Sequence, residues 1–423
     1  MNYVLFAKAL PRRKINPEVN YMDTSKYVQP FEEALSLKTL NEEVDRCLLC
    51  LDAPCSADCP AGTDPGKFIR SARFLNYVGG AETIRENNPL GAICARVCPT
   101  ERYCQKGCSR SGIDRPIDIG KIQQFLTDYE EAHGFKFLPK GKSNGKKIAI
   151  VGSGPAGLTA AATLVKLGYG VEVFEEKKEA GGYLRYGIPE YRLPNAVVDK
   201  EIARIKDLGV KFTLNQKVGQ KELEVLKKKF DAVVLALGAS EGKRLPMFEG
   251  AKNVVTAVDF LAEVKSKAGK VELPKNVLVI GGGDVAMDTV TSLKLLGVEQ
   301  ITDVVYETFA EFKASKKELQ GAQKLGVSIL DGYIPTKFEN GVVEFSHRFK
   351  ESHVSVKADL IILAVGQFTD LGDIKDITLV KGEGTNNGRV FVAGDIAKGE
   401  KTVVYGVRTG KDVAYRIDAI LGD

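Results

Sequence analysis

Five short hydrophobic runs that end in glycine mark the chain after residue 147. Two of them, Ile148–Val151 and Val277–Ile280, lead into a glycine-rich turn, a helix-like segment and a further hydrophobic run. Runs of about four to eight hydrophobic residues bounded by glycine are typical of strands buried on both faces of a parallel sheet. The pattern therefore predicts an α/β fold in which one strand–turn–helix arrangement occurs twice.

The region before residue 140 has a different pattern. Hydrophobic residues recur there at the spacing of one helix face, at Phe68, Ile69, Ala72 and Leu75. Asp64 followed by proline has the residue types of a helix start. We expect a helical N-terminal domain, with the polar stretch 139–147, which contains glycine and proline, as a linker.

The first glycine-rich turn carries a dinucleotide-binding fingerprint. Gly152, Gly154 and Gly157 have the G-x-G-x-x-G spacing, and Glu175 follows the next strand. Such glycines allow a tight turn, close approach of the backbone to a pyrophosphate and close packing of the helix on the strand. The acidic residue about 20 positions on accepts hydrogen bonds from a ribose. A glycine turn without a ligand is the alternative, and the complete fingerprint argues against it.

A second fingerprint begins at Gly281. Gly283 and Ala286 follow at the same spacing, and the next predicted strand ends at Glu307. Because the turn and the acid are both intact, we interpret it as a second dinucleotide site rather than as scaffold alone.

The last hydrophobic run predicts a buried strand at Val390–Ala393, which ends in Gly394 and Asp395. A helix-like segment follows from about Thr402. Two other predicted strands end at Gly238 and Gly366. Glycines at strand ends are typical of places where another backbone or a ligand approaches closely.

All eight cysteines lie between positions 47 and 108. The first four have the spacing C-x2-C-x4-C-x3-C and the second four C-x3-C-x5-C-x3-C. Their confinement to one region indicates a cofactor module.

The spacing favours iron–sulfur clusters over zinc. Structural zinc sites usually present cysteine pairs separated by a longer loop and often use histidine, whereas the three histidines lie outside this group. Cys59 and Cys98 are each followed by proline, as in bacterial cluster-binding runs. Eight thiolates would suffice for two four-cysteine clusters.

Composition excludes several classes of function. The net charge of the 423 residues is only +5, and no basic stripe alternates with aromatic residues, so nucleic acid is not expected as a partner. No hydrophobic run approaches the ~20 residues of a membrane span, and the N-terminus has no signal-peptide pattern. We expect a cytoplasmic protein, a compartment in which clustered cysteines more often bind metal than form disulfides. The basic residues Lys8, Arg12, Arg13 and Lys14 suggest a solvated arm more than a docking surface for an acidic partner.

Taken together, these motifs resemble a family of flavoprotein reductases with two dinucleotide-binding domains. The N-terminal cysteine region is similar to that of the glutamate synthase small subunit and of the flavin half of dihydropyrimidine dehydrogenase. The stretches CLLCLDAPCSADCP, AETIRENNPLGAICARVCPTERYCQKGC, IPEYRLP and EKTVVYGVRTGK favour the second relative, and the similarity covers nearly the whole chain after residue 28.

The resemblance implies a division of the chain into three domains. Residues 1–140 would form a helical domain with two [4Fe–4S] clusters. Residues 141–250 and 368–423 would form a discontinuous FAD-binding domain, with residues 251–367 inserted as the NAD(H)-binding domain. The implied fold is therefore two Rossmann-like domains, one inserted in the other, preceded by an α-helical iron–sulfur domain.

The resemblance also implies ligand sets. The first cluster would be held by Cys47, Cys50, Cys55 and Cys108. The second would be held by Cys59, Cys98, Cys104 and Gln123, the last from the stretch IGKIQQF. This leaves Cys94 outside both sets, although spacing alone would include it, and spacing alone would read Gln123 as an ordinary helix amide.

For the nucleotides, the implied sets combine fingerprint and other residues. FAD would be bound by Gly152, Gly154, Gly157, Glu175, Arg192, Gly394, Asp395 and Thr402. NAD(H) would be bound by Gly281, Gly283, Asp284, Ala286, Glu307 and Gly366. Relatives that use NADPH have arginines near positions 306 and 313, where this chain has Tyr306 and Lys313. Glu307 would repel a 2′-phosphate, so NADH is expected.

The implied activity is that of an electron-input subunit. Hydride from NADH would reach FAD, and electrons would pass through the clusters to an FMN- and iron–sulfur-containing partner subunit that interconverts uracil or thymine and their 5,6-dihydro forms. No catalytic side chain is expected, because the chemistry belongs to the cofactors. The alternatives are a glutamate synthase small subunit, a stand-alone NAD(P)H:acceptor oxidoreductase of the ferredoxin type, and a zinc-stabilised nucleotide-binding module.

Overall fold

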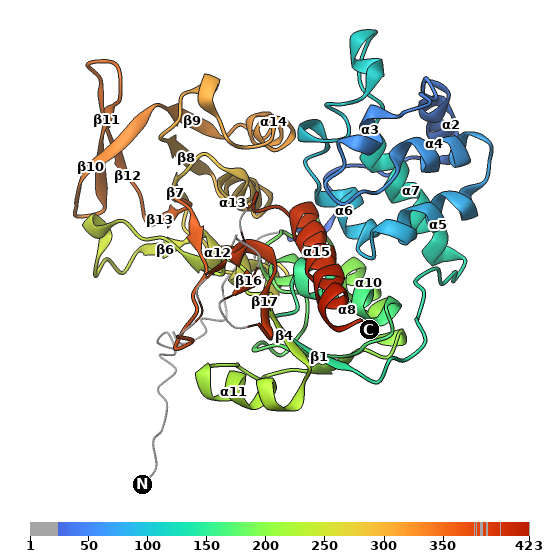
Figure 1. Cartoon of the computed structure of the whole chain (residues 1–423). Coiled ribbons are helices and arrows are strands. Elements are labelled where there is room, and N and C mark those ends of the chain that lie inside the picture. Colours follow the sequence, from blue (N-terminus) through green and yellow to red (C-terminus); the bar gives the residue numbers. More distant parts are fainter. Residues whose placement is uncertain are drawn as a thin grey trace.

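The computed structural model describes residues 24–375, 377, 379–380, 384–385, 388–397 and 399–422. The basic stretch Lys8–Lys14 lies outside the described residues. In chain order, a helical region comes first and two α/β regions follow, which surround separate parallel sheets (Figure 1).

The N-terminal region is helical, as predicted. Its α-helices are α1 (Ser25–Val28), α2 (Leu37–Asp45), α3 (Pro54–Ala57), α4 (Pro65–Arg73), α5 (Tyr77–Asn87), α6 (Gly91–Val97) and α7 (Ile119–Ala132). Two 3-10 helices, η1 (Thr100–Arg102) and η2 (Ser109–Gly112), lie between α6 and α7.

Helix α4 begins as its sequence predicts and ends earlier. The Asp64 side chain accepts a hydrogen bond from the Lys67 backbone N–H, which caps the helix. Phe68 and Ile69 are buried, but Leu75 is 65 % exposed. The prediction that Leu75 belongs to the buried face is wrong, because α4 stops at Arg73 and Leu75 has a left-handed backbone with φ of 59°.

The first sheet has seven strands in the order β15-β16-β17-β4-β1-β2-β3. They are β1 (Lys147–Val151), β2 (Gly170–Phe174), β3 (Lys211–Thr213), β4 (Ala232–Leu235), β15 (Leu379–Val380), β16 (Gly384–Thr385) and β17 (Val390–Val392). The strands from β17 to β3 are parallel. The helices of this region are α8 (Pro155–Lys166), α9 (Tyr183–Tyr186), α10 (Asn195–Asp207), α11 (Gln220–Lys229) and α15 (Val403–Leu421), with a 3-10 turn η5 (Gly394–Ile396).

The second sheet has five parallel strands in the order β6-β13-β7-β8-β9. They are β6 (Val254–Thr256), β7 (Asn276–Ile280), β8 (Gln300–Val305), β9 (Ser328–Asp331) and β13 (Leu360–Leu363). Strand β8 ends two residues before the predicted end at Glu307. The helices here are α12 (Ala257–Ser266), α13 (Asp284–Leu295) and α14 (Lys316–Lys324), with 3-10 turns η3 (Pro246–Phe248) and η4 (Phe309–Glu311).

An antiparallel sheet of β10 (Tyr333–Glu339), β11 (Val342–His347) and β12 (His353–Lys357) extends from this region at the upper left of Figure 1. The chain crosses between the two large sheets twice. The crossings pair as the short antiparallel strands β5 (Glu241–Gly242) and β14 (Gln367–Phe368). The second unit is therefore inserted between strands of the first, in agreement with the predicted fold class.

Helices α8 and α15 pack closely because α15 presents glycine to α8. A Cβ atom at Gly410 would collide with the Ala156 carbonyl oxygen, and one at Gly406 would lie 2.9 Å from Pro155 Cβ. This approach brings the start of α15 beside the start of α8, where the first fingerprint lies. Among the described residues, no helix is long and apolar enough to cross a lipid bilayer.

Candidate cofactor sites

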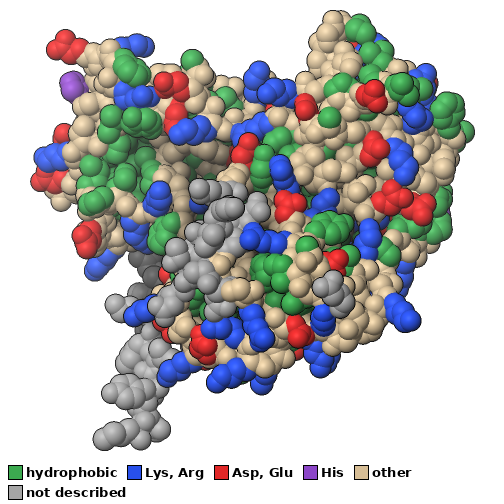
Figure 2. All heavy atoms as spheres, viewed as in Figure 1, with side chains coloured by type: hydrophobic (Ala, Val, Ile, Leu, Met, Phe, Trp, Pro, Cys, Tyr) green, Lys and Arg blue, Asp and Glu red, His purple; other side chains and the backbone are tan. Residues whose placement is uncertain are grey.

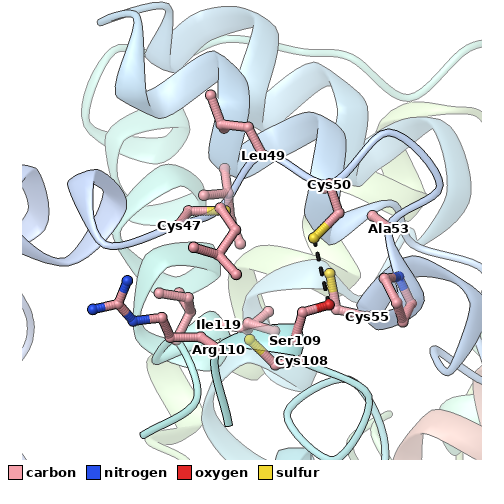
Figure 3. A pocket seen from close by; sticks show the side chains of 14 residues that line it. Cys47, Leu49, Cys50, Ala53, Cys55, Cys108, Ser109, Arg110 and Ile119 are labelled. Carbon is pink, nitrogen blue, oxygen red and sulfur yellow. Dashed lines mark hydrogen bonds between the residues drawn. The ribbon is translucent and has the colours of Figure 1, made fainter. Parts of the chain in front are cut away.

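A cavity in the helical region is lined by four cysteines from three separate segments: Cys47, Cys50, Cys55 and Cys108. The loop after α2, the short helix α3 and the turn before η2 supply them. Figure 3 shows the four side chains around one space, together with Ser109 and Arg110. With adjoining solvent, the empty space amounts to about 400 Å³.

The cavity wall is otherwise largely apolar and includes Ile69, Ile117 and Ile119. Burial raises the pKa of Cys47, and it raises the pKa of Cys55 to about 11. Thiols with such raised pKa values stay protonated at neutral pH unless a bound cation stabilises the thiolate. The chemistry of this donor set therefore fits a metal cofactor.

The arrangement suits a multi-iron cluster better than zinc. Zinc–thiolate bonds of ~2.3 Å require ligands that converge on one point. In the described part of the chain, no three histidine, cysteine or carboxylate side chains converge closely enough to hold a single metal ion. The four thiols instead surround a cavity, as ligands of the four irons of a [4Fe–4S] cluster would.

The second group of thiols lies deeper. Cys98 follows the end of α6, Cys104 is buried, and both lie close enough to Cys59 to interact with it electrostatically. Burial raises the pKa of Cys98 and of Cys104. Cys94, one turn earlier on α6, is buried in the hydrophobic core. Its pKa is raised to about 12 by burial.

Gln123 is buried on α7, which packs against α6. Its Nε2 donates a hydrogen bond to the Gly91 carbonyl oxygen over 2.8 Å. This bond fixes the amide plane and leaves Oε1 as the atom that could bind a metal. Gly91 begins α6 and Cys98 follows the opposite end of that helix, so this hydrogen bond does not by itself bring Gln123 to Cys98. Membership of Gln123 in the second ligand set stays a prediction.

The three glycines of the first fingerprint adopt the geometry that a dinucleotide needs. Gly152 has φ of 101°, and a Cβ at Gly157 would collide with the Gly152 carbonyl oxygen. No atom lies within 4 Å of a Cβ built on Gly154, which precedes the first residue of α8. The backbone there is open to a pyrophosphate at a helix N-terminus, so the site fits FAD.

Glu175 is buried at the end of β2. One of its carboxylate oxygens accepts hydrogen bonds from the Ser153 backbone N–H and hydroxyl, and the other accepts from the Lys177 backbone N–H. A carboxylate can accept about four hydrogen bonds, so one position remains for a ribose hydroxyl.

The predicted C-terminal residues of the FAD site lie together at the starts of α8 and α15. Gly394 has φ of 79°, and a Cβ there would lie 3.1 Å from Ala156 Cβ. Asp395 accepts a hydrogen bond from the Ala239 backbone N–H. Thr402 caps α15.

Arg192, another predicted FAD residue, contacts the inserted unit instead of open space. Its guanidinium pairs with Asp288 on α13 at 2.6 Å and with Glu318 on α14 at 3.3 Å. Sequence reasoning missed these partners, which lie about a hundred positions away. The structure places Arg192 between the two nucleotide-binding units.

The second fingerprint repeats the geometry of the first. Gly281 has φ of 151°, and a Cβ there would collide with the Ala364 carbonyl oxygen. Gly283, before the first residue of α13, has open space around its Cβ position, and Ala286 is fully buried. Gly366 has φ of 109° in the second crossing between the sheets.

Glu307 lies beside the second fingerprint. A Cβ at Gly282 would be 3.2 Å from Glu307 Oε2, so the carboxylate reaches the turn that a ribose would approach. Glu307 also pairs with Lys313 Nζ at 2.6 Å. Arg348 stacks over the Tyr306 ring at 4.1 Å, a contact between the β11–β12 loop and the residue after β8 that no local pattern indicates.

Comparison with known proteins shows the family of the chain. Residues 24–135 match the family model described as dihydropyrimidine dehydrogenase domain II, 4Fe-4S cluster. Residues 146–410 match the model described as pyridine nucleotide-disulphide oxidoreductase. The NAD-dependent dihydropyrimidine dehydrogenase subunit PreT of Escherichia coli K12 is 48% identical over 408 residues, which cover 95% of this chain and 97% of PreT. The chain belongs to the PreT family. PreT of Salmonella typhimurium is similar to the same extent.

Among solved structures, FprA from Mycobacterium tuberculosis in complex with NADPH matches with a TM-score of 0.55 and 17% identity, over 66% of this chain and 85% of that chain. Thioredoxin reductase from T. acidophilum matches with a TM-score of 0.50 and 17% identity, over 66% of this chain and all of that one. At this identity the matches show the fold alone. As a member of the PreT family, the chain is an oxidoreductase that carries an iron–sulfur region and a pyridine-nucleotide region.

Proposed function

We propose that the chain is the electron-input subunit of an NAD-dependent dihydropyrimidine dehydrogenase. Its helical domain, residues 1–140, would hold two [4Fe–4S] clusters. Residues 141–250 and 368–423 would bind FAD, and residues 251–367 would bind NAD(H). The chemistry that bound FAD would supply is acceptance of a hydride from NADH and its conversion into single electrons for the clusters.

One observation carries the proposal: four thiols surround a single cavity in the same chain that holds two open glycine turns, each before a helix N-terminus. The chain's own residues bind and orient. Backbone N–H groups at the starts of α8 and α13 would donate hydrogen bonds to the pyrophosphates. Glu175 and Glu307 would accept hydrogen bonds from the ribose hydroxyls. Cys47, Cys50, Cys55 and Cys108 would hold one cluster. Cys59, Cys98, Cys104 and Gln123 would hold the other.

We propose NADH as the donor. Glu307 lies beside the second glycine turn, which the ribose would approach, and its side chain is 14% exposed, so a 2′-phosphate there would face a largely buried carboxylate. Lys313 offsets part of this charge, but it is 75% exposed and so screened by solvent. Steady-state kinetics with both nucleotides test the point: we expect a higher kcat/KM for NADH, and a higher value for NADPH would overturn it.

The pyrimidine would be reduced on another subunit, which would contain FMN. Both large sheets of the described residues are open and are used by the two nucleotide sites, and they leave no closed β/α barrel for a further flavin. The name of the relatives also describes a subunit. Electrons would leave the helical domain through the clusters to this partner, which reduces uracil or thymine to the 5,6-dihydropyrimidine or catalyses the reverse reaction.

The cofactor content is tested on the purified chain. We expect FAD and about eight irons per chain, as two four-iron clusters require. Cys59→Ala should lose about half of the iron and keep FAD, whereas Cys94→Ala should keep all the iron. Loss of all iron in Cys59→Ala, or of half in Cys94→Ala, would contradict the ligand sets.

The partner is tested by purifying the native chain with what accompanies it. We expect the chain alone to oxidise NADH with an artificial electron acceptor and not to reduce uracil. Addition of the FMN-containing subunit should restore uracil reduction. Robust uracil turnover by the chain alone would refute the two-subunit scheme.

A further inference from the structure

The segment between Cys98 and Cys104 contacts both nucleotide-binding units. Arg102 in this segment donates a hydrogen bond to the Lys313 carbonyl oxygen, and its guanidinium lies 3.6 Å from the Asp284 carboxylate. Figure 1 shows the helical domain beside α14, and the Arg102–Asp284 ion pair connects it to α13. An arginine of the iron–sulfur domain therefore reaches the start of α13, where the second dinucleotide is expected.

These two contacts connect two neighbouring elements that would border the second nucleotide, the start of α13 and the segment 313–315. Asp284 is the first residue of α13, and it also accepts a hydrogen bond from the Ser315 backbone N–H at 2.7 Å. Lys313 belongs to the segment after η4, and its ammonium pairs with Glu307, the proposed ribose acid. The Ala314 backbone N–H also donates a hydrogen bond to the Gly282 carbonyl oxygen, and Arg102 adds a side-chain link between the same two elements.

The residue after Arg102, Tyr103, is fixed on the FAD unit. The Tyr103 hydroxyl donates a hydrogen bond to the Glu400 carboxylate, and its ring lies 6.0 Å from the Tyr405 ring on α15. Tyr103 is 7% exposed. Because the neighbouring residue is held in this way, the backbone of Arg102 is anchored beside the FAD unit.

We propose that Arg102 is a positioning residue of the NAD(H) site, supplied by the iron–sulfur domain. This proposal rests on the proposed function, because it requires that the second fingerprint binds the nucleotide. The guanidinium holds the adenosine-ribose wall at Lys313 and the pyrophosphate wall at Asp284 in one geometry before the nucleotide arrives. It also balances the Asp284 charge, which would otherwise face an anionic pyrophosphate. Preorganised binding sites lose less free energy on ordering, so removal of Arg102 weakens binding.

The test measures binding without turnover. Purified wild-type chain with its cofactors is titrated calorimetrically with NAD⁺, ADP and nicotinamide mononucleotide, and the titrations are repeated with Arg102→Met. We expect the Kd for NAD⁺ and for ADP to rise about five- to tenfold, the size of one lost charge-assisted contact. Nicotinamide mononucleotide, which lacks the pyrophosphate and the adenosine, should change less than twofold. Iron and FAD content should stay the same.

Arg96→Met is the matched control. Arg96 is also an arginine of the helical domain, and it pairs with Asp128 on α7 instead of with the nucleotide unit. Its loss should leave all three Kd values unchanged. Arg102→Lys keeps one cation near Asp284 and should recover part of the NAD⁺ affinity, which measures the site even if Arg102→Met proves unstable.

The outcomes separate the two levels of the argument. Wild-type chain that binds no NAD⁺ would overturn the proposed function. Equal Kd values for NAD⁺ in wild type and Arg102→Met would overturn only the role of Arg102. An equal loss for all three ligands would also overturn it, because a general structural defect would not discriminate between ADP and nicotinamide mononucleotide.

Discussion

Single glycines decide where a ligand can reach the backbone. In each fingerprint the first glycine has a positive φ, which side chains other than glycine rarely adopt. The second glycine is different: Gly154 and Gly283 have ordinary φ values of −71° and −97° and open space around the Cβ position. Protein packing alone would therefore tolerate alanine at these two positions, whereas the proposed dinucleotides would require glycine there.

This contrast gives a matched pair of substitutions. Gly154→Ala should leave the melting temperature of the cofactor-free chain unchanged and reduce FAD retention at least tenfold, because the methyl group occupies the pyrophosphate position. Gly283→Ala should instead keep FAD and weaken NAD⁺ binding. Flavin absorbance of the purified variants and NAD⁺ titration measure both effects. If the two variants lost the same ligand, the assignment of the two sites would be wrong.

At the scale of single elements, the ends of the helices in the iron–sulfur region are decided by more than hydrophobic spacing. Helix α4 has a good cap at Asp64 and a buried face, but it stops before Leu75, which takes a left-handed conformation that favours glycine. The hydrophobic pattern extends to Leu75, two residues beyond the last residue of α4, because the pattern contains no information about the backbone conformation at the helix end.

Leu75→Gly should stabilise the chain. The left-handed conformation costs a leucine about 1–2 kcal/mol, and glycine removes this cost. Glycine also loses more conformational entropy on folding, which offsets part of the gain. We therefore expect the free energy of unfolding to rise by about 0.5–1 kcal/mol. Urea-induced unfolding measures it. Leu51→Gly is the control, since Leu51 is 91% exposed and is not in the left-handed region. An equal gain from Leu51→Gly would contradict the explanation.

At the scale of the whole molecule, buried charges join the regions. Arg85 on α5 pairs with Glu130 on α7 and with Glu201 on α10, each at 2.7 Å, and all three side chains are at most 1% exposed. Arg204 on α10 also pairs with Glu130. The iron–sulfur region is therefore joined to the FAD unit by an ion-pair network from which water is excluded. Hydrophobic side chains also gather along the outer margin of the iron–sulfur region, at the right of Figure 2.

Arg85→Met should destabilise the docking of the two regions. Removal of one partner of a buried pair leaves uncompensated charge and costs about 3–5 kcal/mol. We expect the first unfolding transition in calorimetry to move to lower temperature and limited proteolysis to cut between the regions. Lys67→Met, which breaks the exposed Lys67–Glu86 pair, should change stability by less than about 0.5 kcal/mol. Similar effects of both variants would contradict the importance of burial.

Lys265 on α12 gives a second test at this scale. Its ammonium donates hydrogen bonds to the carbonyl oxygens of Leu184 and Leu193, and burial lowers its pKa to about 7, with Glu190, Arg185 and Asp288 as nearby charges. In the unfolded chain its pKa returns to 10.5. Between these values the unfolded state binds more protons, so stability rises with pH.

The expected result is a difference between wild type and Lys265→Met. From about pH 7 to pH 10 the free energy of unfolding of wild type should rise relative to that of Lys265→Met, by about 1 kcal/mol per pH unit. Below pH 7 the difference should be constant, because the lysine is charged in both states. Melting temperatures measured across this pH range decide the matter. A difference that does not depend on pH would show that Lys265 titrates normally.

The sequence by itself determined what depends on neighbours along the chain. The strand, glycine turn and helix of each fingerprint are local, and so are the cap at Asp64 and the grouping of the cysteines, because residue spacing and side-chain size set them directly. The α/β class and the helical N-terminal region followed from these patterns.

Tertiary structure decided the contacts between distant residues. It brings Cys108 to the cavity lined by Cys47, Cys50 and Cys55, and it sets Arg192 against Asp288 and Arg102 against Asp284. These contacts depend on how helices and sheets pack, which no local spacing encodes. For the same reason, the segment between the first cysteines and the second could be identified as cofactor-binding from its sequence, while its contact with the NAD(H) unit became visible only in the folded chain.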